Sequence, residues 1–129
     1  MTCFWDGIFK SLNNDDFKFI GEKKTNIRNL INILKIKNTE MNDVLWQNTK
    51  PKKQEINEHM IAIKDYNISK IHDGHLTSSC DSFLLLICQL FQVKIIHRYM
   101  KNFIIYQNSK KERKTLHYSS SGSHLVCSR

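Results

Sequence analysis

The longest apolar run of the sequence, Phe83 to Phe91, predicts a buried helix late in the chain. Only Gln89 interrupts this run, so a helix over it would be apolar on nearly every side. Ser78 and Asp81 precede it at the spacing of a capping box, in which side chains satisfy backbone N–H groups at a helix start. A helix without a polar face has to be covered from several sides. We therefore expect residues 79–91 to form the central helix of the domain.

The chain before this run shows further helical periodicity. Residues of one helical face recur in the first twelve positions, at Phe4, Trp5, Ile8, Phe9 and Leu12. Aliphatic residues recur three and four positions apart over residues 23–35 and again over 52–66, which predicts two more helices. Thr39 resembles the N-cap of a short helix through Trp46. Residues 13–21 are interpreted as a turn of Asn and Asp followed by an extended link.

After the central helix the pattern changes to β-branched and aromatic residues. Strands are expected over residues 93–99, 103–106, 115–118 and 124–127. Lys101 and Asn102 form a hairpin-length connection between the first two, and a serine-rich turn over residues 119–123 precedes the last. Helices first and antiparallel strands last indicate an α+β fold, with helices packed on a small, mostly antiparallel sheet. At this length, residues 1–129 are expected to form a single domain.

The chain is basic. Twenty Lys and Arg against twelve Asp and Glu give a formal net charge of +8, which favours anionic partners such as nucleic acid or a membrane surface. The densest basic clusters are Lys50, Lys52 and Lys53, and Lys110, Lys111, Arg113 and Lys114. Neither cluster is interleaved with aromatic residues that could stack on bases, so we interpret both as solvated loops. A basic nucleic-acid-associated protein is therefore the weakest of the functional hypotheses.

No targeting or membrane segment is apparent, and a cytoplasmic protein is expected. The residues after Met1 lack the charged and apolar regions of a signal peptide, and the longest apolar run is far below the roughly 20 residues of a membrane span. The cysteines Cys3, Cys80, Cys88 and Cys127 lack the close pairing of a zinc ribbon, so free thiols are expected. His72 and His75 are interpreted as exposed residues of a turn. No metal or other cofactor is expected.

Cys3 stands at the start of the first expected helix. Backbone N–H groups and the positive end of the helix dipole stabilise a thiolate there and can hold a developing oxyanion. The alternative is that Cys3, next to Phe4 and Trp5, is a small buried hydrophobic residue. His124, at the start of the last expected strand, can serve as a base for Cys3 from the opposite end of the chain.

These stretches resemble the ovarian tumour (OTU) family of cysteine proteases, which act as deubiquitinases. Residues 3–12, a Cys followed by two bulky apolar residues and then a small and an aliphatic one, look like the family's nucleophile helix. Residues 73–76, the helix 79–91 and the strand 93–97 look like its Gly-containing turn, central helix and following strand. The strand that precedes the serine-rich turn, together with that turn and His124, resembles its final strand, loop and catalytic histidine.

The resemblance implies an OTU-like, papain-type fold and a thiol-dependent ubiquitinyl hydrolase of minimal, viral type, in the host cytoplasm if the protein is viral. Cys3 would be the nucleophile and His124 the base, and the partner would be ubiquitin or a ubiquitin-like modifier. Because the tail of ubiquitin carries arginines, acidic residues are expected near the cleft. The candidates are Asp15, Asp16, Glu22, Glu40 and Asp43.

Two departures from the family pattern leave alternatives open. The Asp-Gly-Asn-like loop before the family's Cys, which helps to form the oxyanion hole, is replaced here by Met1 and Thr2. An aromatic residue and then Asp or Asn usually follow the catalytic histidine, whereas Leu125 and Val126 follow here, and a valine cannot orient an imidazole. The site then takes a third residue from elsewhere, works as a dyad, or is inactive. In the last case the chain would be a ubiquitin- or protein-binding module.

His117 is the alternative base, because the aromatic Tyr118 follows it. It lies within an expected strand, however, where its side chain is committed to one face of the sheet. His124 stands at a junction of loop and strand, and we therefore prefer it.

Overall fold

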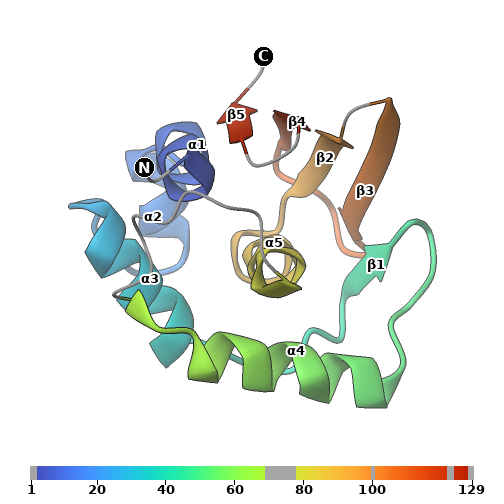
Figure 1. The fold of residues 1–129 in the computed structure, drawn as a ribbon. Helices are drawn as coiled ribbons and strands as arrows, with labels where there is room; N and C mark the ends of the chain where they lie inside the picture. The colour runs from blue at the N-terminus through green and yellow to red at the C-terminus, as the bar shows by residue number, and fades with distance from the viewer. Residues whose placement is uncertain (1–2, 69–77, 100, 122–123, 128–129) are drawn as a thin grey trace.

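The computed structural model describes residues 3–68, 78–99, 101–121 and 124–127. Its helices are α1 (Cys3–Ser11), α2 (Asn14–Phe19), α3 (Ile27–Ile36), α4 (Lys53–Asp65) and α5 (Ser78–Phe91). Its strands are β1 (Val44–Trp46), β2 (Lys94–Tyr99), β3 (Asn102–Asn108), β4 (Thr115–Ser121) and β5 (His124–Cys127). Helices dominate the first part and strands the second, so the predicted α+β class is confirmed (Figure 1).

The five strands form one mixed sheet in the order β1-β3-β2-β4-β5. β2 and β3 form the expected hairpin, and the pairs β1–β3 and β4–β5 are also antiparallel. β2 and β4 run parallel, so the sheet is mostly antiparallel, as expected, with one parallel pair. β1 pairs with the outer edge of β3, so β4 pairs instead with the free edge of β2. β4 runs there in the same direction as β2.

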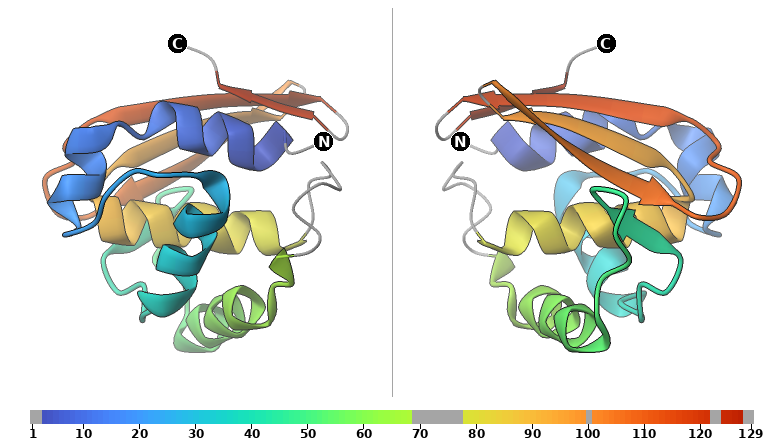
Figure 2. Two further views of the ribbon diagram at one scale, coloured as in Figure 1. Left: turned by 90° about the vertical axis from the view of Figure 1, so that its left-hand side faces the viewer. Right: turned by 90° about the vertical axis from the view of Figure 1, so that its right-hand side faces the viewer.

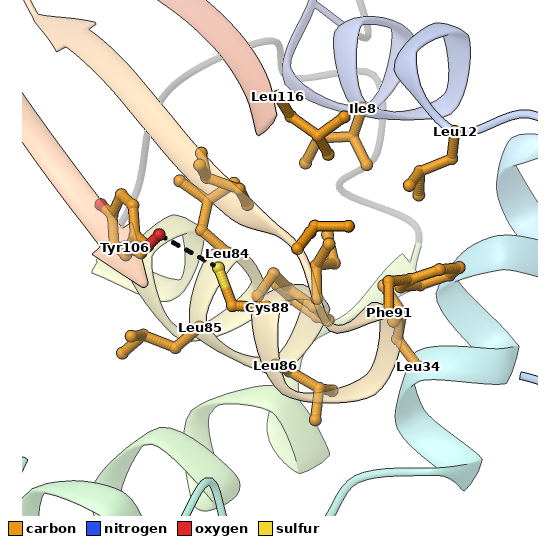
Figure 3. Close-up of a cluster of buried hydrophobic side chains, with 14 of the residues drawn as sticks. Ile8, Leu12, Leu34, Leu84, Leu85, Leu86, Cys88, Phe91, Tyr106 and Leu116 are labelled. Carbon is orange, nitrogen blue, oxygen red and sulfur yellow. Dashed lines mark hydrogen bonds between the residues drawn. The ribbon is translucent and has the colours of Figure 1, made fainter. Parts of the chain in front are cut away.

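The helices lie on the inner side of the sheet and beside its β5 edge (Figures 1 and 2). α5 contacts the helices α2, α3 and α4 as well as the strands β1, β2 and β3. Residues 83–88 of α5 are each at most 1% exposed. Figure 3 shows Leu84, Leu85 and Leu86 pointing in different directions into the core. The prediction of a central helix covered from several sides is confirmed.

Leu86→Ala is expected to lower the free energy of unfolding by about 2 to 5 kcal/mol, through lost transfer free energy and a cavity. The side chain of Leu86 is 0% exposed, so the site cannot exchange the lost contacts for water contacts. Chemical denaturation measures the effect. Ile61→Ala on α4 is the control, because Ile61 is 58% exposed and its loss should change stability by no more than about 0.5 kcal/mol. Equal effects of the two substitutions would contradict the central position of α5.

Residues 14–19 form a short helix, α2, where a turn and an extended link were expected. The Asn13 side chain accepts a hydrogen bond from the backbone N–H of Asp16 at 2.9 Å, and the Asp16 carboxylate accepts one from the N–H of Asn13 at 2.8 Å. This capping box begins a helix that buries Phe17, which is 1% exposed. The prediction was wrong because Asn and Asp residues favour turns and helix starts equally well. Asn26 similarly caps α3 and delays its start to Ile27.

The carboxylate of Asp16 also connects α2 to the loop before β4. Asp16 is 1% exposed, and its Oδ1 lies 3.1 Å from Nη1 of Arg113. Its Oδ2 forms an ion pair with the Nζ of Lys114. Nη1 of Arg113 also donates to the carbonyl of Phe91, at the end of α5, at 3.1 Å. The interpretation of Arg113 and Lys114 as part of a solvated cluster is therefore wrong, because they neutralise a buried charge.

Residues 44–46 form the edge strand β1, where a short helix was expected. Val44 is buried against the core, and the ring of Trp46 stacks on Tyr106 of β3 at 6.2 Å between centroids. A tight turn follows, in which Gln47 and Asn48 have φ of 53° and 64°. The side-chain amide of Gln47 then bonds the β3 backbone on both sides of residue 104. Residues 44–46 form a strand because they pair with β3, more than 50 residues later in the chain, and the local sequence contains no signal for that pairing.

Candidate functional site

α1, which begins with Cys3, is anchored to the core by Trp5. The indole ring of Trp5 is 3% exposed and packs edge-on against Phe83 of α5, with centroids 4.8 Å apart. Its N–H donates to the hydroxyl of Tyr66 at 3.0 Å, so the one polar atom of the buried ring is satisfied. The first turn of α1 therefore has a fixed position relative to α5.

The other end of α1 is fastened to the sheet. Figure 3 shows Ile8 of α1 beside Leu116 of β4, with Leu12, the residue after α1, close by. The hydroxyls of Ser11 and Tyr118 are hydrogen-bonded at 2.5 Å. These contacts come from the inner side of β4, and α1 also contacts the edge strand β5. The first helix and the last strand thus lie side by side.

The start of α1 and the start of β5 lie at the same end of the molecule in both views of Figure 2. Cys3 is the first residue of α1, and His124 is the first residue of β5, where it pairs with Ser121 of β4. The side chains of Cys3 and His124 lie outside the described part of the chain. The fold therefore brings the backbone positions of the two predicted site residues to one end of the molecule from opposite ends of the sequence.

The helix start at Cys3 provides a favourable field for a thiolate. The first N–H groups of an α-helix have no acceptor within the helix, and the dipole places partial positive charge there. Asp6 in the same turn introduces a negative charge that offsets part of this field. A protonated histidine beside the sulfur would then contribute more to stabilising the thiolate than the helix start does alone.

His117 lies in the interior of β4, on the face away from α1. Its neighbours Leu116 and Tyr118 are 5% and 1% exposed and point toward the helices, whereas His117 is exposed. Residues of a strand alternate between the two faces of the sheet, so the position of His117 faces away from α1. Ser121, four residues further along β4, pairs with His124, so the position of His124 lies on the same face as His117. The preference for His124 therefore rests on its place at the start of β5, at the end of the molecule where α1 begins (Figure 2). The serine-rich segment that follows continues β4 as far as Ser121, which corrects the expectation of a turn from residue 119.

The cysteines differ in their environments. Cys88 is 0% exposed on α5, and its Sγ lies 3.7 Å from the carbonyl oxygen of Tyr106. Burial raises the pKa of the Cys88 thiol well above its usual value, because a thiolate there would lose its hydration. Cys80 lies in the first turn of α5 and Cys127 in β5, and their side chains are outside the described part. Cys88 is therefore an inert structural thiol.

A limiting amount of iodoacetamide at neutral pH is expected to modify Cys3 before Cys88 in the folded protein. The helix start favours a reactive thiolate at Cys3, whereas Cys88 is protonated and closed off from solvent. Peptide mapping by mass spectrometry gives the order of labelling. Labelling under denaturing conditions is the control, since the two thiols should then react alike. Preferential labelling of Cys88 in the folded protein would count heavily against a site at Cys3.

A second polar cluster, which the sequence analysis missed, lies between α4, α5 and the sheet. Nδ1 of His59 is 2.7 Å from the hydroxyl of Ser82, and the hydroxyl of Tyr106 donates to Asp81 at 2.5 Å. Burial lowers the pKa of His59 and of His97 on β2, and the nearby Asp81 charge opposes that shift in both. Burial thus favours the neutral form of both imidazoles. The cluster joins α4 to α5 and the sheet.

One signal in the sequence could have found this cluster. His59 lies three positions after Ile56 and four before Ile63, so it shares the buried face of α4 with them.

Among the described residues, no group of three or more His, Cys, Asp or Glu could hold a metal ion. His72 and His75 lie outside these residues. In the same described ranges, no helix is long and apolar enough to cross a membrane.

The acidic residues expected near a ubiquitin tail are mostly engaged elsewhere. Asp16 is buried in its ion pairs, and Glu22 lies 3.4 Å from Lys37. Asp43 lies 3.3 Å from Lys110, and hydrogen bonding from Gln89 together with the lysine lowers its pKa. Asp15 and Glu40 are exposed. Asp15 lies in α2, which follows the end of α1 opposite Cys3, so the structure does not place it beside the start of α1.

Comparisons with protein-family models, with characterised proteins and with solved structures find no match for this chain.

Proposed function

We propose that this chain is a cysteine protease of the OTU type that removes ubiquitin or a ubiquitin-like modifier from lysine side chains. Cys3 is the nucleophile and His124 is the base. The proposal rests on one observation. The helix that begins with Cys3 contacts the strand that begins with His124, and both begin at the same end of the molecule (Figure 2).

The chemistry needs only these two side chains and the start of α1. His124 takes the proton of Cys3, and the thiolate attacks the carbonyl carbon of the modifier's last residue. The backbone N–H of Cys3 donates to the oxyanion, and loss of one such donor in other enzymes lowers the rate by roughly two to three powers of ten. The C–N bond breaks as His124 returns its proton to the lysine amine. Water, deprotonated by His124, then cleaves the thioester and regenerates the thiol.

Treatment with ubiquitin carrying a C-terminal propargylamide tests the activity. The wild-type protein should form a covalent adduct of one ubiquitin per chain, and Cys3→Ala should form none. Cys88→Ala is a poor control because the side chain is buried, so Cys80→Ser is the matched variant and should still react. Capture that persists in Cys3→Ala, or is lost only in Cys80→Ser, would contradict the proposal.

The second candidate is a binding module without catalysis, which the residues Leu125 and Val126 after His124 favour. A valine offers no atom to orient the imidazole. The same samples separate the two functions. A module would form no adduct but would bind unmodified ubiquitin, with an affinity that Cys3→Ala leaves unchanged, in a fluorescence anisotropy titration.

A further inference from the structure

The charge of this chain is concentrated in its last third, which forms most of the sheet. Residues 93–129 contain eight Lys and Arg and a single acidic residue, Glu112, and so carry +7 of the formal net charge of +8. Residues 1–92 contain twelve Lys and Arg against eleven Asp and Glu. Several of these cations are engaged, because Lys110 pairs with Asp43, and Arg113 and Lys114 pair with Asp16. Lys94 and Arg98 lie in β2, and Lys101 lies in the turn between β2 and β3.

The outer face of the sheet carries part of this charge. All five helices of the described chain lie on the inner side or beside β5, so the strands turn their other face outward (right-hand view of Figure 2). Ile95, Tyr106 and Leu116 are buried on the inner face, and the alternate residues occupy the outer face. The outer positions of β2, β3 and β4 include Lys94, Ile96, Arg98, Phe103, Ile105 and His117.

These residues form two rows across three strands. In one row Phe103 of β3 is directly opposite Arg98 of β2, which is opposite Ser119 of β4. In the other row Ile96 of β2 lies between Ile105 and His117. Directly opposite residues of an antiparallel pair have Cβ atoms about 4.5 to 5.5 Å apart, so Phe103 and Arg98, and Ile105 and Ile96, are immediate neighbours. Ser119 and His117 of β4 extend the two rows across the parallel pair.

Phe103 is the large aromatic side chain of this surface. It is 57% exposed, and the exposed Arg98 lies opposite it while the exposed Lys101 stands in the turn before it. An exposed ring with two cations at neighbouring positions of the hairpin offers one base a stacking partner and the flanking phosphates two counter-charges. The one acidic residue of the region, Glu112, accepts the N–H of Asn108 at 3.0 Å in the loop beyond β3.

We propose that this outer sheet face, defined by Phe103, Arg98, Lys101, Lys94 and His117, binds single-stranded nucleic acid. Phe103 stacks on a base, and the cations contact phosphates. An open sheet with an exposed aromatic residue and basic neighbours suits splayed single strands, whose bases are accessible, better than a duplex. The Arg98 end of this surface lies at the same end of the sheet as the start of β5, because Arg98 pairs with Ser119 and Ser119 with Val126. The proposal involves neither Cys3 nor His124 and does not depend on protease activity.

Fluorescence anisotropy with a labelled single-stranded oligothymidylate of about 20 nucleotides, longer than one such site, tests the proposal. Phe103→Ala should weaken binding about 5- to 100-fold, the range expected for the loss of one stacked base. Phe103→Trp should retain or strengthen it. Ile61→Ala, an equally exposed apolar residue on α4, should change the affinity less than twofold.

Salt dependence tests the cations separately. The logarithm of affinity should fall linearly with the logarithm of salt concentration, and Arg98→Ala or Lys101→Ala should each reduce that slope by about 0.7. Lys64 is exposed on α4, away from the sheet face, so Lys64→Ala removes one positive charge elsewhere and should leave the slope unchanged. Capture by the ubiquitin probe should be normal in every one of these variants, so failure of this proposal and failure of the protease proposal are distinguishable.

Three results would overturn the proposal. The first is no binding at about 50 mM salt, where charge contacts are strongest. The second is an equal effect of Lys64→Ala and Arg98→Ala, which would mean that only the net charge acts. The third is labelled polyglutamate binding as tightly as the oligonucleotide with the same loss on Phe103→Ala, which would identify an acidic protein as the partner.

Discussion

His124→Ala is expected to lower the rate of hydrolysis of a fluorogenic ubiquitin substrate by about 10² to 10⁴-fold, the usual contribution of a general acid–base group. The substitution removes both the base that forms the Cys3 thiolate and the acid that protonates the leaving amine. His124 is the first residue of the edge strand β5, so replacing its side chain with a methyl group should leave no cavity in the core around α5. Circular dichroism and thermal unfolding should therefore match the wild type.

His117→Ala is the matched control for this prediction. His117 is exposed on the outer face, opposite Ile96, so its loss should leave most of the activity. The reverse result, with His117 essential and His124 dispensable, would contradict the assignment.

Asp16→Ala is expected to lower the free energy of unfolding by about 3 to 5 kcal/mol, the usual effect of breaking a buried ion pair from one side. The carboxylate of Asp16 is 1% exposed and accepts from Arg113, Lys114 and the N–H of Asn13. Without it, two cations with side chains 25% and 29% exposed lose their counter-charge, and α2 loses its capping box. Denaturant unfolding measures the change.

Asp15→Ala provides the comparison for this prediction. Asp15 lies in the same turn of α2 but is exposed, so its removal should change stability by less than about 1 kcal/mol. Asp16→Asn should fall between the two, because an amide retains the shape and one acceptor but not the charge. Equal effects of Asp15→Ala and Asp16→Ala would show that the ion pairs do not hold α2 in place.

The parts of the fold that depend on local pattern were predictable from the sequence. The apolar run of α5, the periodicity of α4 and the hairpin of β2 and β3 each contain their own signal, because the buried face repeats every 3.6 or every 2 residues. α2 and β1 were missed because their signals are ambiguous or three residues long. Packing of Phe17 and pairing with β3 decided them.

The candidate site was predictable as two positions at the starts of two elements. The sequence did not show that these two positions lie at the same end of the molecule. That arrangement follows from the parallel pairing of β2 and β4, which places β5 at the sheet edge beside α1. The role of Asp16 was missed for the same reason, since its partners Arg113 and Lys114 lie far along the chain. The basic sheet face was also missed, because it appears only once strand register shows which residues share a face.

The central claim, a thiol and an imidazole brought together by α1 and β5, is tested most directly by the rate of Cys3 alkylation as a function of pH. The wild-type protein and His124→Ala are compared by mass spectrometry of the peptide that contains Cys3. In the wild type, the rate should remain high at pH values well below the pKa of a free thiol, about 8.5, because the imidazolium stabilises the thiolate. In His124→Ala the midpoint should move up toward that value. Identical profiles for the two proteins would contradict the pairing of Cys3 with His124.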